Sequence, residues 1–341
     1  MEKLEIDKLV RKNILSLKPY ASARDEYSGE SAVFLDANEN PFGELNRYPD
    51  PHQKELKHKL GVLKSLPVEN IFVGNGSDEV IDLTFRVFCN PGKDKALIFS
   101  PTYGMYEVSA EINDVELIRV PLTPSFQIDD HALKIHLDDE TLKLIFICSP
   151  NNPTGNCIEN TAVLLQQFKG IVVIDEAYID FSNKESFIAK INRYPNLIVM
   201  QTLSKAWGLA AARVGMAYAD ARIISLFNKI KPPYNVSGPN QKAALMALGN
   251  LDEFEKRKAI ILEQKAWLVN QMTAMAVVKK VYPSDANFIL VEVTDAGKIY
   301  TALVNQDVIT RNRHSMVANC LRITVGSPQE NKTLIHALSK M

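Results

Sequence analysis

The sequence predicts an α/β fold with a large, doubly wound and mostly parallel sheet, followed by a smaller α+β domain. Short apolar runs without polar alternation recur between residues 71 and 200, which is typical of strands buried on both faces of a sheet. Helical stretches separate these runs, and such alternation favours a sheet covered by helices. After about residue 240 a long charged helix precedes short strands, so a second domain is expected there.

The large domain is expected to cover residues 46–240. Its strands are predicted at residues 71–73, 96–99, 144–148, 171–174 and 197–200. Its helices are predicted at residues 78–88, 160–168 and 186–193. Every one of these strands is followed directly by polar or turn residues. Ligands bind beyond the carboxyl ends of parallel strands, so we expect the five polar segments to meet in one crevice.

The small domain is expected to cover residues 241–341. It is entered through a helical region at residues 240–274 that has a break near Gly249 and Asn250. Short strands follow at residues 288–293, 308–310 and 321–325. Residues 1–45 precede the sheet, and we expect them to form an arm that packs on the small domain.

Composition excludes several classes of protein. The 341 residues include 39 Lys and Arg against 40 Asp and Glu, which argues against a nucleic-acid-binding protein. The charged N-terminus lacks the apolar core of a secretory signal, and no run of 18 apolar residues suggests a membrane span. The four cysteines and six histidines show no metal-binding spacing. We therefore expect a cytoplasmic protein with reduced cysteines and no metal site.

Two of the polar segments could bind a phosphate group. GNGSDE, at residues 74–79, is a Gly-rich turn that opens a helix, and such a turn binds anions through free backbone N–H groups. Its structural alternative is a tight turn in which Ser77 is the N-cap. TLSKAWGLAAAR, at residues 202–213, places Ser204 and Arg213 where both could contact a phosphate. Lys205 in the same segment is expected to be partly buried, and a desolvated lysine is a nucleophile toward aldehydes.

The other three segments offer groups for a planar ligand. DEAYIDF, at residues 175–181, places Asp175 after a buried strand, where it could pair with a cationic heterocycle such as a pyridinium. Tyr178 could reach the same ligand. SPNNPTG, at residues 149–155, offers the Asn152 amide, and PTYGMY, at residues 101–106, offers the Tyr103 ring for stacking. Each of these residues, taken alone, could equally be a capping, loop or packing residue.

The order of these five segments resembles the class I and II, fold-type I aminotransferases, which use pyridoxal phosphate. The resemblance implies that Lys205 binds the cofactor covalently, that Asp175 pairs with its pyridine nitrogen, and that Tyr103 stacks on its ring. Tyr178 and Asn152 would contact the phenolic oxygen. The phosphate would be held by Ser77, Asp78, Thr202, Ser204, Arg213 and, from a neighbouring subunit, Tyr48. The expected partner is therefore a second copy of the chain, in a homodimer with shared sites.

Four further segments resemble the branch of this family that acts on L-histidinol phosphate: LDANENPFG at residues 35–43, RYPDP at 47–51, ANF at 286–288 and LRITVGSPQEN at 321–331. This resemblance implies transfer of the amino group of L-histidinol phosphate to 2-oxoglutarate, in histidine biosynthesis. The substrate would be bound by Tyr20, Asn38, Asn287, Arg311 and Arg322. Arg322 could serve the phosphate and the carboxylate in turn, because its planar fork fits both oxyanions.

Three alternatives remain open. The same fold could carry an aromatic or broad-range aminotransferase, or a decarboxylase of a phosphorylated amino acid. A non-catalytic module that binds pyridoxal phosphate is a third reading, which the presence of both Lys205 and Asp175 disfavours. Fold alone does not separate these functions.

Overall fold

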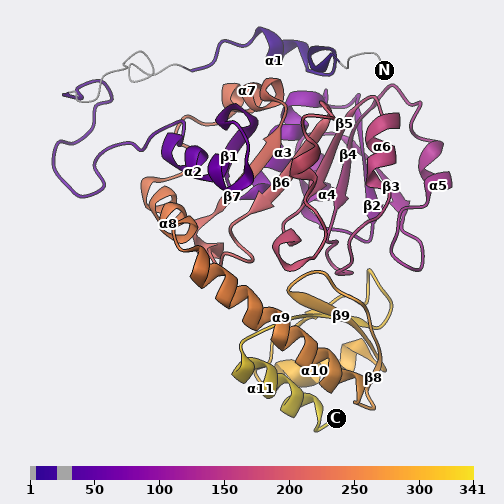
Figure 1. Ribbon diagram of the computed structural model, residues 1–341. Coiled ribbons are helices and arrows are strands. Elements are labelled where there is room, and N and C mark those ends of the chain that lie inside the picture. Colours follow the sequence, from indigo (N-terminus) through magenta and orange to yellow (C-terminus); the bar gives the residue numbers. More distant parts are fainter. Residues whose placement is uncertain (1–4, 21–32) are drawn as a thin grey trace.

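The computed structural model describes residues 5–20 and 33–341. These residues form two bodies, each built on its own sheet and joined by two helices, α8 (Gly238–Leu248) and α9 (Leu251–Thr273) (Figure 1). The larger sheet has seven strands in the order β1-β7-β6-β5-β4-β2-β3. Their bounds are Ile71–Asn75 (β1), Lys95–Ser100 (β2), Glu116–Pro121 (β3), Leu142–Cys148 (β4), Ile171–Asp175 (β5), Leu197–Thr202 (β6) and Val214–Ala219 (β7).

The strand directions bring the expected polar segments to one edge. Five strands run parallel to one another, in the order β3, β2, β4, β5 and β6. Strand β7 is antiparallel to both of its neighbours, β6 and β1. Two successive reversals leave β1 running in the same direction as β6. The carboxyl ends of all five predicted strands therefore lie at the same edge of the sheet, as the sequence predicts.

Helices bury both faces of this sheet. Within β5, Val172 and Ile174 face one apolar cluster, which α2 (Lys54–Lys64), α6 (Thr161–Gln167) and α8 share. Ile171 and Val173 face the other cluster, which α3 (Ser77–Phe88), α4 (Met105–Ile112) and α7 (Ala221–Ile230) share. Burial on both faces explains why this strand is an unbroken apolar run rather than an alternating one.

The small body follows the predicted pattern with one error. The helical region does break at Gly249 and Asn250, where the Asn250 side chain accepts the backbone N–H of Glu253 at 3.3 Å and caps α9. The strand predicted at residues 308–310 is wrong, because the Val308 N–H bonds to the Leu303 carbonyl at the end of a helix. The small body contains β8 (Val278–Val281), β9 (Phe288–Val293), α10 (Ala296–Val304), β10 (Arg311–Asn312), β11 (Cys320–Thr324) and α11 (Pro328–Leu338).

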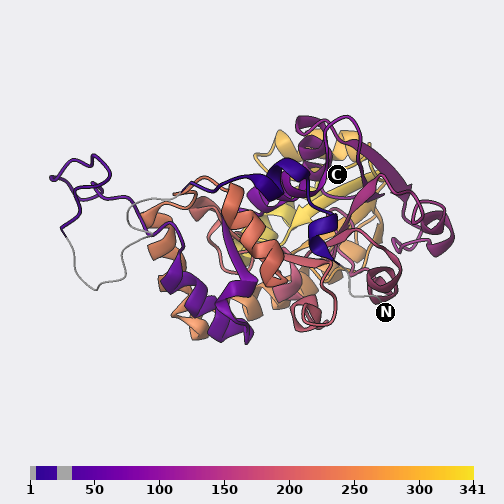
Figure 2. The same cartoon turned by 90° about the horizontal axis from the view of Figure 1, so that it is seen from above.

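Two other expectations need correction. The helix predicted at residues 186–193 is only a short 3₁₀ turn, η5 (Phe187–Lys190). The N-terminal arm is expected on the small body, but its described residues 5–20 pack on the large one; residues 1–4 and 21–32 of this arm lie outside the described residues. Around η1 (Ile6–Lys8) and α1 (Lys12–Ser16), the apolar side chains of Ile6, Val10 and Ile14 join the cluster that contains α3 and α7. Figures 1 and 2 both show this segment lying along the large body.

The remaining elements are short. Helix α5 (Asp130–Lys134) contributes Leu133 to the cluster shared by α2, α6 and α8. The 3₁₀ turns η3 (Val68–Asn70), η4 (Ile179–Phe181) and η6 (Ala210–Ala212) lie in connections. Across residues 5–20 and 33–341, no helix has the length and apolar character that crossing a membrane would require. The same residues contain no group of three or more His, Cys, Asp or Glu side chains placed to hold a metal ion.

Candidate active site

The carboxyl edge of the large sheet and one face of the small sheet enclose a cavity of about 350 Å³. Most of the residues predicted for the site line it: Ser77, Asp78, Tyr103, Asn152, Asp175, Tyr178, Thr202, Ser204, Lys205, Arg213, Arg311 and Arg322. The five polar segments therefore meet in one cavity, as the sequence predicts.

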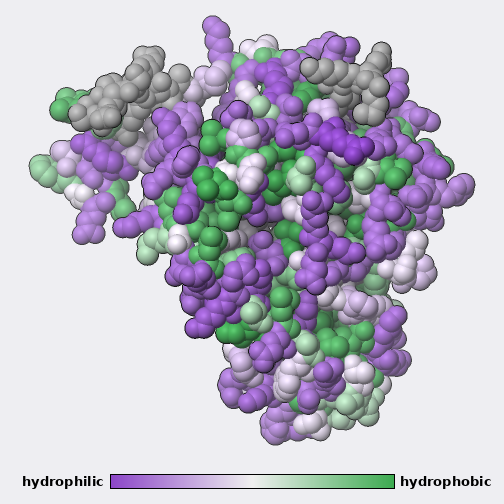
Figure 3. Space-filling view, in the orientation of Figure 1, coloured by the Kyte–Doolittle hydropathy of each residue, from purple (hydrophilic) through white to green (hydrophobic). Residues whose placement is uncertain are grey.

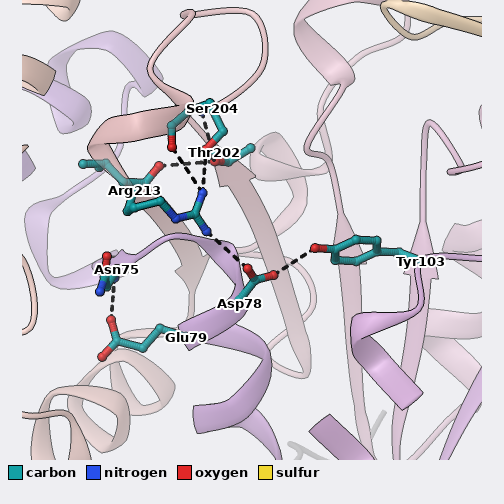
Figure 4. A network of polar contacts seen from close by, with 9 residues as sticks. Asn75, Asp78, Glu79, Tyr103, Thr202, Ser204 and Arg213 are labelled. Atoms are coloured by element: carbon teal, nitrogen blue, oxygen red, sulfur yellow. Dashed lines mark hydrogen bonds and ion pairs between the residues drawn. The ribbon is translucent and has the colours of Figure 1, made fainter. Parts of the chain in front are cut away.

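One end of the cavity is built to hold an anion (Figure 4). Helix α3 begins at Ser77, directed at the cavity, with first-turn N–H groups that have no partner within the helix. The Arg213 guanidinium contacts Asp78 Oδ2 at 3.2 Å and Ser204 Oγ at 3.4 Å. Thr202 Oγ1 lies 3.0 Å from Ser204 Oγ. Two hydroxyls, a guanidinium and a helix N-terminus thus surround one point.

Glycine makes this approach possible. A Cβ at Gly215 of β7 would lie 2.2 Å from the Ser77 nitrogen, so only a residue without a side chain lets β7 pass the helix start. Gly76 is the N-cap of α3, with a φ of 79° and no side-chain cap. The alternative in which Ser77 is the N-cap is therefore wrong.

Asp175, the last residue of β5, provides a buried carboxylate. Its Oδ2 accepts the Tyr106 hydroxyl at 2.6 Å, and its Oδ1 accepts the Ala177 N–H at 3.0 Å. Burial raises the pKa of Asp175, whereas these two hydrogen bonds oppose the rise. The positive charge of Lys205 lowers this pKa further, but to a smaller extent. A cationic group placed against this carboxylate would supply the charge partner that it otherwise has only weakly.

Lys205 lies in the turn after β6. Its side chain lines the cavity and is partly buried there, as the sequence predicts, and its neighbours Ala206 and Trp207 are buried. Trp207 fixes the turn by stacking on Phe254 of α9, with ring centroids 3.9 Å apart. Desolvation by the cavity wall, followed by the charge of Arg322, lowers the pKa of Lys205. A larger fraction of the amine is then neutral and nucleophilic at a given pH.

Asn152 and Tyr178 form the wall between the amine and the small body. The Asn152 Nδ2 lies 3.5 Å from the Tyr178 hydroxyl, and its Oδ1 accepts Arg322 Nη1 at 2.6 Å. The Lys205 Nζ lies 5.6 Å from the centre of the Tyr178 ring. Tyr103 closes the opposite side, and its hydroxyl donates to Asp78 Oδ1 at 3.1 Å. The amide and both phenols are thus held in place before any ligand binds.

Four predicted residues do not line this cavity within their own chain. The Tyr48 ring is half-exposed and stacks on Tyr234, with centroids 4.3 Å apart. Tyr20 is exposed beside a second cavity, and Asn38 lies on an exposed segment in the left-handed region, with a φ of 55°. Asn287 accepts the Val325 N–H through its carbonyl. The structure therefore does not bring these four side chains to the other site residues.

Sequence reasoning missed two residues of the cavity region. Tyr106, in the second position of α4, is fully buried and bonds to Asp175. It belongs to PTYGMY, but no local pattern shows that it reaches back to β5. Arg313 also lines the cavity. Its signal was available, because Arg311 and Arg313 are two residues apart and alternate residues of an extended chain share a face.

The donor set fits pyridoxal phosphate. The anion pocket matches its phosphate group, the Asp175 carboxylate matches a protonated pyridine nitrogen, and Tyr103 is available for stacking. The amine of Lys205 faces the same cavity, where an aldehyde could react with it. Each functional group of the cofactor therefore has a matching group in one cavity.

Comparison with known proteins gives a consistent result. The family described as aminotransferase class I and II matches residues 24–338. The histidinol-phosphate aminotransferase of Cytophaga hutchinsonii is 51% identical over 342 residues, which cover 98% of each chain. The protein of the same name from Bacteroides thetaiotaomicron is 50% identical over 341 residues, also covering 98% of each chain.

Solved structures share the fold. The histidinol-phosphate aminotransferase from Clostridium acetobutylicum superposes with a TM-score of 0.80 at 24% identity, covering 87% of this chain and 90% of that one. The histidinol-phosphate aminotransferase from Sinorhizobium meliloti, solved in complex with pyridoxal-5'-phosphate, superposes with a TM-score of 0.79 at 23% identity, covering 89% of each chain. At this level of identity the superpositions establish the fold, and the longer sequence matches carry the functional comparison.

Proposed function

The chain belongs to the class I and II aminotransferase family, and from this premise we propose that it transfers the amino group of L-histidinol phosphate to 2-oxoglutarate. The products are imidazole-acetol phosphate and L-glutamate, formed in histidine biosynthesis. The relatives that are about half identical over the whole chain carry the name histidinol-phosphate aminotransferase. The observation that carries the proposal is that Lys205, Asp175 and four arginines line one cavity.

The cofactor is pyridoxal phosphate, which when bound supplies an electron sink for the substrate Cα. We assign its phosphate to the N-terminus of α3 together with Thr202, Ser204 and Arg213. Asp175 would keep the pyridine nitrogen protonated through a charge-assisted hydrogen bond. Tyr103 would stack on the ring, and Asn152 and Tyr178 would orient its oxygen.

Lys205 is assigned the proton transfers. Its lowered pKa leaves the amine able to accept a proton from the substrate Cα as a general base, and the resulting ammonium can then return a proton as a general acid. Arg322 lines the same cavity, close enough for its charge to lower the pKa of Lys205. It would bind the anionic end of the substrate. Two half-reactions that share one set of residues imply ping-pong kinetics.

The site is completed in a homodimer. Tyr48 is not among the residues that line the cavity of its own chain, and its side chain is half-exposed at the surface. The residues before it expose large apolar side chains: Val33 is 86% exposed, Leu35 88%, Phe42 81% and Leu45 78%. Burial of such a segment against a second copy would remove this apolar surface from water.

We also assign the protein to the cytoplasm, since its four cysteines are buried and free.

A single half-reaction tests the activity. The purified holoprotein is mixed with L-histidinol phosphate in the absence of 2-oxoglutarate, and the absorbance of the cofactor is followed. We expect conversion of the aldehyde form to the amine form, and recovery of the aldehyde form when 2-oxoglutarate is added. Phenylalanine and threonine phosphate are the comparison substrates. A faster reaction with phenylalanine, or release of carbon dioxide from threonine phosphate, would contradict the proposal and support one of the alternatives.

A further inference from the structure

Three arginines share one face of the small sheet. Strands β10 and β11 are antiparallel, and Arg311 pairs directly with Arg322 across them. Arg313 follows Arg311 by two residues, and all three side chains line the cavity. Like charges at directly opposed positions of a sheet destabilise it. A third guanidinium added to this pair increases the repulsion, so an anionic ligand is the simplest reason to gather them.

No carboxylate of the described residues neutralises this cluster. The arginines that form ion pairs within the described ranges are others, namely Arg47, Arg86, Arg119, Arg213, Arg222 and Arg257. The pKa values of Arg313 and Arg322 are both lowered, mainly by burial and then by neighbouring charges, among them Arg311. The cluster therefore presents uncompensated positive charge to the cavity.

Arg313 has unused hydrogen-bonding capacity. Its Nε is buried and has no hydrogen-bond partner among the described residues. Its backbone N–H donates to the Cys320 carbonyl at 2.9 Å, which fixes the position of the chain. The Arg322 Nε is also buried without a partner among the described residues, but its Nη1 already bonds to Asn152 at 2.6 Å and its guanidinium lies 5.4 Å from the centre of the Phe288 ring. Arg313 is thus held in place while its side chain keeps donors for a ligand.

We propose that Arg313 is a specificity residue that recognises the phosphate group of the amino donor. The inference rests on the proposed function and deepens it. A phosphate monoester carries close to two negative charges at neutral pH, because its second pKa is about 6. A carboxylate carries one charge and can be matched by a single guanidinium. Arg313 supplies the additional charge and donors that a dianion needs, so it favours phosphorylated donors over those that end in a carboxylate or an aromatic ring.

The test compares substrates with and without the phosphate. Wild type, Arg313→Gln and Arg313→Lys are assayed in single half-reactions with L-histidinol phosphate, with histidinol and with L-glutamate. Arg257→Gln is the matched control, because Arg257 pairs with Glu253 on the outer helix α9. The melting temperature and the pyridoxal phosphate affinity of each variant are measured as well.

For Arg313→Gln we expect kcat/KM with histidinol phosphate to fall by about 10- to 100-fold, mostly through KM, as for loss of a charged hydrogen bond. Values for histidinol and glutamate should stay within about threefold of wild type. Arg313→Lys should recover part of the loss, because it retains the charge but not the fork. An equal fall with histidinol phosphate and histidinol would overturn the role of Arg313 and leave the proposed function intact. Failure of the wild type to react with histidinol phosphate would overturn both.

Discussion

At the scale of single residues, the Tyr106–Asp175 contact influences the ionisation of one carboxylate in the cavity. Both side chains are buried, and the phenol donates to the carboxylate at 2.6 Å. Burial raises the pKa of Tyr106 well above its ordinary value, so the phenol stays protonated and remains a donor. Burial also raises the pKa of Asp175, and the bond from Tyr106 is the main effect that opposes this rise. Tyr106 therefore helps to keep Asp175 ionised.

The substitution Tyr106→Phe tests this dependence. Without the donor, the pKa of Asp175 rises further, so the carboxylate is lost at a higher pH on acidification. We expect the dissociation constant of pyridoxal phosphate to increase about tenfold near neutral pH, and to increase more as the pH falls. Fluorescence titration of the apoprotein between about pH 5 and 9 measures this shift.

Tyr218→Phe is the matched control, because the Tyr218 hydroxyl is equally buried but has no hydrogen-bond partner among the described residues. Its removal should leave the cofactor affinity unchanged at every pH. If Tyr106→Phe shows the same pH profile as wild type, Tyr106 does not act through the charge of Asp175.

At the scale of elements, the sequence predicts five of the seven strands of the large sheet and misses the exposed edge strand β3 and the buried strand β7. Strands β1, β2, β4, β5 and β6 and helices α3 and α6 are confirmed within a few residues. Strand β3 escapes the prediction, because it lies at the edge of the sheet and carries Glu116 and Arg119 among its apolar residues. Strand β7 follows Arg213 without a break and contains Gly and Ala, so it resembles a continuation of the loop.

The site shows the same division. Residues at strand ends, such as Asp175 and Lys205, could be predicted because a parallel sheet brings strand ends together. Tyr106 could not be assigned a role, because its position depends on how α4 packs against the sheet, whereas Arg313 could have been inferred from its spacing to Arg311. Tyr48 remains a prediction, since its proposed partner belongs to another copy of the chain.

The packing of β7 against the start of α3 gives a prediction at this scale. In Gly215→Ala the new Cβ would lie 2.2 Å from the Ser77 nitrogen and 2.3 Å from the Gly76 carbonyl carbon, both of which are backbone atoms. Backbone cannot move away as a flexible side chain can, so α3 must shift. We expect a loss of about 1–3 kcal/mol in the free energy of unfolding and a clear fall in pyridoxal phosphate affinity.

Urea unfolding of the apoprotein and cofactor titration measure the two effects separately. Gly297→Ala in α10 is the control, because its new Cβ would meet only Asp295 Oδ1, at an ordinary 3.4 Å. Wild-type cofactor affinity in Gly215→Ala would mean that the N-terminus of α3 does not hold the phosphate.

At the scale of the whole molecule, the chain has surface that a monomer does not use. The segment of residues 33–48 projects from the large body in Figures 1 and 2, and Figure 3 shows apolar surface on it beside polar side chains. Tyr48 lies at the end of this segment, outside the cavity of its own chain. A symmetric dimer would bury the segment and present each Tyr48 to the other subunit.

Mixing two inactive variants tests the shared site. Lys205→Ala removes the amine, and Tyr48→Ala removes the proposed phosphate contact from the neighbouring subunit. When the variants are unfolded together and refolded in equal amounts, about half of the dimers are mixed, and each mixed dimer has one site with both native residues. We expect the mixture to recover about a quarter of wild-type activity. If Tyr48 instead serves the site of its own chain, both native residues must come from one subunit. Every subunit in the mixture carries one of the two changes, so no site is then intact. The mixture would then show no more activity than the average of the two variants measured alone.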